Sequence, residues 1–355
     1  MKVAPILSEL GKYPDEFVPL FVHTGQHYDY QLSEVFARAL ELPKPDAHLD
    51  VVRDNVAQQM ADIIAKFDRF LEQERPDLVI VVGDVTSTAA CALAAAQRFT
   101  PVAHVEAGLR SRDRTMPEEL NRLVADTLSD LLFTPSADAD QNLLDENMPA
   151  QCIHRVGNVM IDTLFNFLPQ VEDCGILNEL HLEAHGFALF TMHRASNVDH
   201  SGTLIGLLDA LEEIQQRLPV VFPVHPRTRK RIEEFGLAER FDAMPNLHRI
   251  EPLGYFEIVR LQQTARLVLT DSAGIAEETT ALGVPCLTLR ENTERPVTIT
   301  EGSNQLVGCD SERIVAAATA ILKIDGKTDY SVPQLWDGQS AQRLVAVLRQ
   351  GIVRR

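Results

Sequence analysis

The sequence contains few cysteines and no long apolar stretch. Its five cysteines are an odd number, lie far apart and form no C-x-x-C pair, which argues against a disulfide framework and a thiolate zinc site. No apolar stretch reaches the roughly 18–20 residues of a membrane helix, and the N-terminus lacks the pattern of a signal peptide. These absences predict a protein of the reducing cytoplasm that does not bind a membrane.

Basic residues are also scarce. The chain has 33 Lys and Arg against 51 Asp and Glu, a formal net charge of −18. Such a surface repels phosphate backbones and anionic lipid headgroups, so nucleic-acid and membrane-surface binding are poor hypotheses. An anionic small ligand would need a local basic pocket.

Apolar runs alternate with helical patterns along the chain. The expected strands are residues 17–23, 77–84, 101–106, 131–136, 187–193, 219–225, 266–272 and 285–290. The expected helices are residues 54–73, 86–98, 117–129, 201–217, 254–264 and 274–282. Strands that are apolar on both faces are typical of parallel sheets covered by helices, so we expect a doubly wound α/β protein.

Two domains are expected, because 355 residues exceed the roughly 100–200 of a usual domain. The alternation of strands and helices pauses between about residues 158 and 186. We place the domain boundary in this pause, after residue 160.

Three carboxylates of the first half lie at strand ends or helix starts, where open α/β sheets bind their ligands: Asp84, Glu106 and Glu118. Individually, Asp84 could cap the next helix, and Glu118 could be a first-turn acid after Pro117. Together they predict an acid/base set. Arg110, in "HVEAGLRS" directly after Glu106, either closes a loop through a salt bridge or faces a substrate.

In the second half, "TDSAGIAEE" leads from a strand into a helix start at Ser272 to Gly274. Free backbone N–H groups there would receive a phosphate, although a plain Ser N-cap explains the same residues. Arg290 and Arg295 follow the next strand and could grip phosphate oxygens, or could pair with Glu291 or Glu294.

Two histidines, His193 and His225, also end strands of the second half, each close to an arginine. An imidazole there could hold a ribose, a phosphate or a leaving group, and a structural role is the alternative. His23 and His27 flank Gly25 in a turn and do not share a helix face, so we expect no metal.

Together, these segments resemble the non-hydrolysing UDP-N-acetylglucosamine 2-epimerases. The matching stretches include "HTGQHYDYQLSEVF", "GDVTST", "HVEAGLRSRDRTMPEELNR", "VGNVMIDTL", "TMHRASN", "PVHPRT", "EPLGYFE", "TDSAGIAEETTALGVPCLTLRENTERP" and "DGQSAQR". They cover nearly the whole chain in family order.

The resemblance implies a glycosyltransferase-B-like fold, with two Rossmann-like domains facing a cleft that holds the UDP-sugar. The N-terminal domain would cover residues 1–160, completed by a C-terminal helix at 338–355, and the UDP-binding domain residues 161–337. It also implies a homodimer, and we expect no cofactor.

The reaction implied is epimerisation of UDP-N-acetylglucosamine to UDP-N-acetylmannosamine. The proton on carbon 2 is not acidic, so UDP leaves carbon 1 as carbon 2 loses its proton, and UDP then adds again to a 2-acetamidoglucal. This chemistry requires an acid and a base near the sugar, and cations around the diphosphate.

Carried over by position, the family's catalytic residues fall on Asp84, Glu106, Glu118 and His193. Which carboxylate abstracts the proton stays open. The expected substrate-binding residues are Lys2, Arg110, His225, Ser272, Ala273, Gly274, Glu278 and Arg295.

Three departures from the family pattern qualify these expectations. Met1 falls on an internal position of the family, so we expect that the first strand of the N-terminal domain precedes the given start. The residues "YDY" after "TGQH" put in doubt an allosteric site that some bacterial members have, and "DVVRDNVAQQM" lacks a glycine-rich turn.

Several alternatives stay open. One is a sister enzyme acting on a UDP-diacetamido-uronic acid, and another is a hydrolysing 2-epimerase that releases free sugar. A glycosyltransferase of the same fold and a non-catalytic UDP-sugar sensor complete the set.

Overall fold

The computed structural model describes residues 1–25, 42–51, 55–324 and 329–351. The chain forms two compact units. Unit 1 comprises Met1–Asn166 and Gln334–Arg355, and unit 2 comprises Phe167–Pro333. The first junction lies within helix α7 (Val159–Glu172). The segment after "TGQH", on which an expectation about allostery rests, and part of "DVVRDNVAQQM" lie outside the described residues.

Unit 1 contains a parallel sheet of four strands in the order β3 (Val79–Val82), β4 (Val102–Val105), β5 (Leu131–Thr134) and β6 (Ile153–Arg155). Its helices are α1 (Ala4–Leu10), α3 (Val56–Glu74), α4 (Thr86–Gln97), α5 (Pro117–Leu128), α6 (Ala137–Asp145) and α17 (Ser340–Arg349). A short 3-10 turn, η1 (Ala150–Cys152), precedes β6. Strands β1 (Val22–His23) and β2 (Ala47–His48) pair with each other in a separate parallel ladder.

Helix α3 shows how the local sequence sets these elements. Asn55 caps it by accepting from the backbone N–H of Gln58 at 2.9 Å. Ile63, Phe67 and Leu71 follow at a spacing of four and are buried against the sheet. The start and the buried face of the helix were therefore both visible in the sequence.

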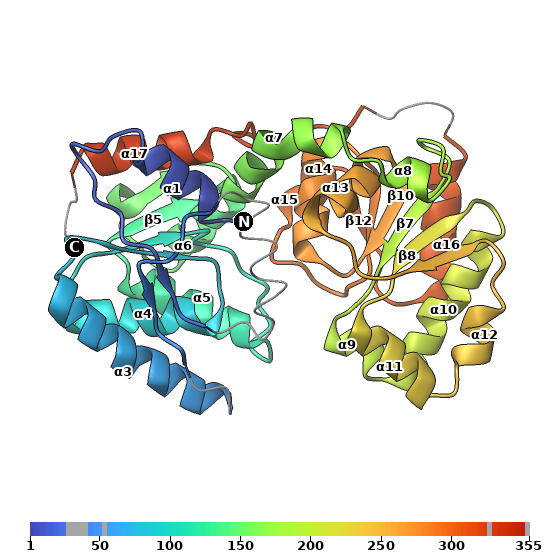
Figure 1. Cartoon of the computed structure of the whole chain (residues 1–355), viewed down its shortest axis with the longest axis horizontal. Helices are drawn as coiled ribbons and strands as arrows, with labels where there is room; N and C mark the ends of the chain where they lie inside the picture. The colour runs from blue at the N-terminus through green and yellow to red at the C-terminus, as the bar shows by residue number, and fades with distance from the viewer. Residues whose placement is uncertain (26–41, 52–54, 325–328, 352–355) are drawn as a thin grey trace. The chain divides into compact units, whose positions relative to one another are not determined.

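The C-terminal segment belongs to the core of unit 1. Leu344 and Leu348 of α17 pack in one apolar cluster with Ile6 and Leu10 of α1, and the red α17 lies beside the blue α1 (Figure 1). Trp336 is buried and donates from Nε1 to the carbonyl oxygen of Pro135 at 2.9 Å. The C-terminal segment with Trp336 and α17 therefore completes the fold of unit 1.

Unit 2 contains one parallel sheet of six strands, in the order β12-β11-β10-β7-β8-β9. The strands are β7 (Ala188–Thr191), β8 (Val220–Pro223), β9 (Leu247–Ile250), β10 (Leu267–Thr270), β11 (Cys286–Thr288) and β12 (Asn304–Leu306). The order reverses between β7 and β10, and the crevice beyond the carboxyl ends of strands at such a switch point is where doubly wound sheets bind their ligands.

Except for α8, which precedes β7, the helices of unit 2 follow its strands in sequence. They are α8 (Ile176–Glu179), α9 (Ala195–Val198), α10 (Ser201–Gln215), α11 (Pro226–Glu234), α12 (Ala238–Asp242), α13 (Tyr255–Thr264), α14 (Ala273–Leu282), α15 (Val297–Thr300) and α16 (Ser311–Leu322). Every residue of β7 and of β10 is buried, as expected for central parallel strands.

The prediction of a strand over residues 17–23 was largely wrong. Only Val22 and His23 join a ladder, and Val18 and Leu20 are exposed by 85% and 42%. Pro19 between them has no N–H to donate, which disfavours a ladder there. The short strands β2, β6, β9 and β12 were not expected.

All five cysteines are free thiols. Among the described residues, no helix combines the length and apolar character required to cross a membrane.

Candidate active site

Glu106 and Lys2 meet at the carboxyl end of β4. The Nζ atom of Lys2 lies 2.6 Å from Oε2 of Glu106, whose residue is only 4% exposed. Burying the carboxylate of Glu106 is costly, and its ion pair with the partly exposed Lys2 offsets part of this cost.

The backbone of Glu106 is left-handed, with φ at 70°. Such a conformation costs a side-chain-bearing residue of order 1–3 kcal/mol and persists only where surrounding contacts impose it. The backbone N–H groups of Glu106 and Ala107 both donate to the carbonyl oxygen of Phe133, at 3.0 and 3.1 Å. The turn is thereby fixed to β5.

Asp84 follows β3 and forms an ion pair with Arg122 of α5. Asn121 of the same helix donates to the carbonyl oxygen of Asp84 at 2.9 Å. Helix α4 begins after Val85 without a side-chain cap, so the alternative in which Asp84 caps it is wrong. Asp84 is therefore held by α5, and its side chain stays 23% exposed.

Glu118 lies in the first turn of α5 and is exposed. It precedes Asn121 by three residues and Arg122 by four, so it lies on the helix face whose side chains contact Asp84. The neighbouring Glu119 is buried instead and accepts from the backbone N–H groups of Ser111 and Arg112 at 2.9 and 3.0 Å.

Arg110 closes its loop. Its buried guanidinium forms ion pairs with Asp126 at 2.7 Å and with Glu146 at 2.6 Å, and donates to the carbonyl oxygen of Leu109 at 2.8 Å. These contacts support the loop-closing alternative, and the expected contact of Arg110 with substrate stays a prediction.

In unit 2, His193 follows β7 at the switch point and is oriented by Asp271, which follows β10. Nδ1 of His193 lies 3.1 Å from Oδ1 of Asp271. The other oxygen of this fully buried carboxylate accepts from the backbone N–H groups of His193 and Arg194, at 2.9 and 2.8 Å, and from Asn197 at 3.2 Å.

Burial opposes ionisation of Asp271, but the hydrogen bonds from His193 and the backbone outweigh it and lower the pKa of this carboxyl. The ionised carboxylate fixes the ring of His193, whose side chain is 45% exposed. This pairing is the one that Ser-His-Asp enzymes use to orient a histidine. Sequence analysis named His193 but missed Asp271, although "TDS" follows a strand.

His225 follows β8, and its ring lies 5.7 Å from that of His193, centroid to centroid. Its Nδ1 accepts from the backbone N–H of Arg227 at 3.2 Å and so caps α11. Burial, followed by the charges of His193 and Arg227, lowers the pKa of His225, which favours its neutral form.

The start of α14 lies beside Asp271. The hydroxyl of Ser272 caps the helix by accepting from the backbone N–H of Ile275 at 3.5 Å, as the plain alternative for this stretch predicted. Ala273 and Gly274 occupy the first turn, whose N–H groups have no partner within a helix. A helix N-terminus of this kind suits a phosphate.

Glu278 lies one turn further along α14 and is 3% exposed. Gln262 of α13 donates to its Oε2 at 2.8 Å. Burial raises the pKa of Glu278 to about 7, although the hydrogen bond from Gln262 opposes this shift. The side chain can therefore exist near neutrality as an acid that both donates and accepts.

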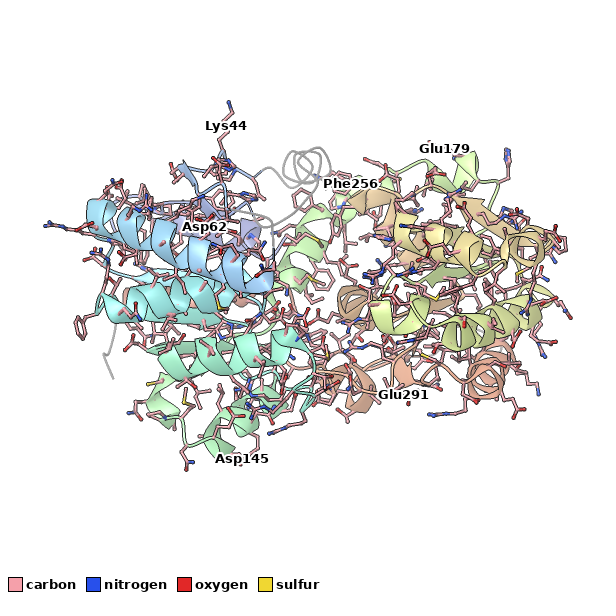
Figure 2. All side chains as sticks on the ribbon, turned by 90° about the horizontal axis from the view of Figure 1, so that it is seen from below. Lys44, Asp62, Asp145, Glu179, Phe256 and Glu291 are labelled. Atoms are coloured by element: carbon pink, nitrogen blue, oxygen red, sulfur yellow. The ribbon has the colours of Figure 1, made fainter. Side chains whose placement is uncertain are left out.

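The two arginines after β11 are buried in ion pairs. Arg290 pairs with Glu294 at 2.7 Å, and Arg295 pairs with Glu277. Glu291, labelled in Figure 2, instead accepts from the backbone N–H of Cys309 at 3.3 Å. Burial alone would raise the pKa of Glu294, but the charges of Arg295 and Arg290 dominate and lower it to about 2.

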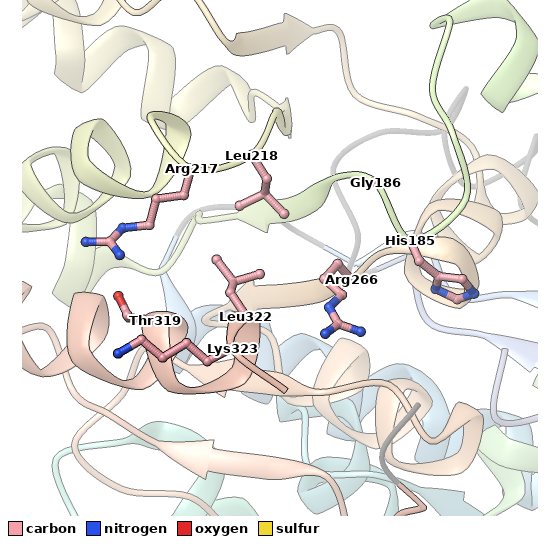
Figure 3. A pocket seen from close by; sticks show the side chains of 8 residues that line it. All are labelled: His185, Gly186, Arg217, Leu218, Arg266, Thr319, Leu322 and Lys323. Carbon is pink, nitrogen blue, oxygen red and sulfur yellow. The ribbon is translucent and has the colours of Figure 1, made fainter. Parts of the chain in front are cut away.

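A cavity of about 370 Å³ lies elsewhere in unit 2, at the amino ends of the strands. Figure 3 shows the eight lining residues, which include Arg217 and Lys323. These two follow the last residues of α10 and α16. Cations at these positions offset the negative ends of the helix dipoles. The positive charge at the cavity therefore has a structural explanation that requires no ligand.

Within the described part of the chain, no group of three or more His, Cys, Asp or Glu residues is arranged to hold a metal ion.

Comparison with known proteins shows to which family the chain belongs. The family model described as UDP-N-acetylglucosamine 2-epimerase matches residues 11–349. The chain belongs to the UDP-N-acetylglucosamine 2-epimerase family.

Three relatives illustrate the similarity of this family member. It is 40% identical to a "UDP-N-acetylglucosamine 2-epimerase homolog" of Methanococcus maripaludis, over 98% of this chain and 96% of the relative. It is equally 40% identical to a "UDP-2,3-diacetamido-2,3-dideoxy-D-glucuronate 2-epimerase" of Pseudomonas aeruginosa, over 92% and 90%. The crystal structure of the Methanocaldococcus jannaschii UDP-GlcNAc 2-epimerase in complex with UDP-GlcNAc and UDP matches with a TM-score of 0.89 and 37% identity, over 99% and 96%.

The glycosyltransferase-B-like, two-Rossmann α/β fold predicted from the sequence is confirmed by this match.

Proposed function

We propose that the protein interconverts UDP-N-acetylglucosamine and UDP-N-acetylmannosamine by inverting carbon 2. UDP leaves carbon 1 as the carbon 2 proton is removed, and it returns to the 2-acetamidoglucal after a proton is delivered to the other face. Membership of the family supports this reaction. The observation that carries the proposal is the buried Glu106, held beside Lys2 in a left-handed backbone at a strand end.

Asp84, Glu106 and Glu118 are proposed to supply the proton transfers, with Lys2 positioning the carboxylate of Glu106. His193, oriented by Asp271, is the proposed fourth catalytic residue. Groups that are fixed before the substrate arrives stabilise the transition state more strongly, because they do not have to reorganise during the reaction.

Unit 2 is proposed to bind the UDP moiety. The N-terminus of α14 would receive a phosphate, and Glu278 would accept or donate hydrogen bonds at the ribose. The proposed contacts are His225, Ser272, Ala273, Gly274, Glu278 and Arg295.

Incubation with UDP-N-acetylglucosamine in heavy water tests the reaction. NMR should show deuterium entering carbon 2 of both sugars, with UDP-sugars as the only accumulating products. Glu106→Gln should lower the exchange rate by about 10²–10⁴-fold, the usual contribution of acid/base groups. Glu72→Gln, on the exposed face of α3, is the matched control and should keep the wild-type rate.

Accumulation of free N-acetylmannosamine would instead identify a hydrolysing enzyme. UDP-sugar binding without exchange would identify a sensor, and either result would overturn the proposal.

A second candidate substrate is a UDP-diacetamido-uronic acid. It is favoured by the Pseudomonas aeruginosa relative, whose identity to this chain equals that of the Methanococcus maripaludis relative. Measuring kcat/KM for both UDP-sugars in one preparation decides between them, because the same elimination can operate on either.

We further propose that the enzyme acts in the cytoplasm as a homodimer. The five free thiols support a reducing compartment. Leu120 and Val124, four residues apart on α5 and about 40% exposed, support a contact surface between copies. Sedimentation at several concentrations tests the dimer, and a monomer throughout would overturn it.

A further inference from the structure

His104 lies within β4, two residues before Glu106, and is fully buried. Its Nδ1 lies 2.6 Å from Oδ1 of Asp126, and its Nε2 lies 2.8 Å from the carbonyl oxygen of Gly83. A carbonyl oxygen only accepts hydrogen bonds, and so does an ionised carboxylate. Both ring nitrogens must then donate, which a neutral imidazole cannot do.

The surroundings of Asp126 keep its carboxylate ionised. Its Oδ2 lies 2.7 Å from Nη1 of Arg110 and accepts from the backbone N–H of Gly108 at 3.1 Å. Burial opposes the charge, but His104 and Arg110 together lower the pKa of Asp126. Burial likewise opposes the charge of His104, but Asp126, Gly83 and Glu106 raise its pKa. The pair is therefore imidazolium and carboxylate.

This pair joins the two turns that carry the acids of unit 1. Gly83, whose carbonyl His104 holds, directly precedes Asp84. Gly108, whose N–H Asp126 holds, follows Glu106 by two residues. Both glycines have positive φ, at 76° and 80°. Glycine backbones are conformationally free, so hydrogen bonds from other elements are required to hold each turn in one conformation.

We propose that His104 is a positioning residue: as an imidazolium paired with Asp126, it fixes the turn of Asp84 relative to the turn of Glu106 for proton transfer. It is sealed behind these turns and does not touch the substrate. The inference rests on the proposed function, because the proton transfer it serves is the one at carbon 2.

The first test is kinetic. His104→Gln supplies at most one donor direction and carries no charge, so kcat for carbon 2 exchange should fall by about 100-fold, the cost of a misplacement near 1 Å. KM and the affinity for UDP should change less than about threefold, because the proposed UDP contacts are in unit 2. His154→Gln, a half-buried histidine of β6 in the same sheet, is the matched control and should keep wild-type kcat.

The second test needs no variant. In the wild-type protein labelled with ¹⁵N-histidine, one buried ring should show two protonated nitrogens at about pH 8, where a free imidazole is neutral. Asp126→Asn should convert this ring to a neutral one and lower kcat as His104→Gln does.

Wild-type kcat in a folded His104→Gln variant would overturn the proposal. A neutral wild-type ring would overturn it even if the variants did not fold. A parallel loss of kcat and UDP affinity would show a general structural role instead. If the wild-type protein exchanged no deuterium at carbon 2 of either UDP-sugar while the ring stayed doubly protonated, the proposed function alone would have failed.

Discussion

Replacing Glu278 with glutamine should make the protein more stable at alkaline pH and change its stability little at acidic pH. In the unfolded chain this carboxyl ionises around its ordinary pKa of 4.5, and in the folded protein only around pH 7. Unfolding therefore releases a proton between these values, and the free energy of unfolding falls as the pH rises through this window. Above about pH 7 the carboxyl is ionised in both states, so the free energy of unfolding lost to its burial stays constant.

The magnitude follows from the shift. The pKa lies about 2.5 pH units above its ordinary value, and each unit corresponds to about 1.4 kcal/mol, so the full cost is about 3–4 kcal/mol. Glutamine retains an oxygen to accept from Gln262 but carries no charge. Glu278→Gln should recover most of this free energy at about pH 8.5 and little of it at about pH 5.

Urea unfolding followed by circular dichroism at the two pH values measures the effect, and the fluorescence of the single tryptophan, Trp336, reports unit 1 separately. Glu277→Gln is the matched control at the adjacent position. It removes the partner of the buried Arg295 and should destabilise at both pH values. An equal gain for Glu278→Gln at both pH values, or a loss at alkaline pH, would refute the reasoning.

Three further outcomes are expected. Asp271→Asn should lower kcat by at least about tenfold in a folded protein, because the ring of His193 loses the carboxylate that orients it; unchanged kcat in a steady-state assay would contradict this. Arg110→Met should reduce the free energy of unfolding by about 3–5 kcal/mol in chemical denaturation, since it removes the buried cation that pairs with both Asp126 and Glu146, with KM unchanged in the fraction that folds. Lys2→Met should lower kcat by at least about tenfold, because the carboxylate of Glu106 loses the ammonium group 2.6 Å away that positions it, and an unchanged kcat would separate Lys2 from the chemistry.

The strand ends were predictable because buried parallel strands leave a simple local signal, an apolar run followed by polar residues. Asp84, Glu106 and His193 were found in this way, as was the cap at Ser272. The partners that hold them were not found. Asp126 is 22 residues from His104 and Asp271 is 78 from His193, so only the packing of α5 on β4 brings the first pair together and only the pairing of β7 with β10 the second.

Edge elements were missed for a different reason. Strands β6 and β12 are three residues long and partly exposed, so they lack the apolar run by which a central strand is recognised. Arg110 illustrates a third limit. The sequence shows a cation beside an acid, but which carboxylates neutralise it depends on α5 and on Glu146, just after α6.

The return of the C-terminal segment to unit 1 has a consequence for synthesis. Unit 2 is one continuous stretch of chain, so all of its residues are synthesised before Trp336 and α17 of unit 1. Unit 1 must wait for Trp336 and α17, although its first residues emerge earliest. Nascent unit 1 would thus expose the apolar surface of α1 for most of the translation time, and a chain truncated after residue 333 and released from the ribosome should have its second unit folded and its first unfinished.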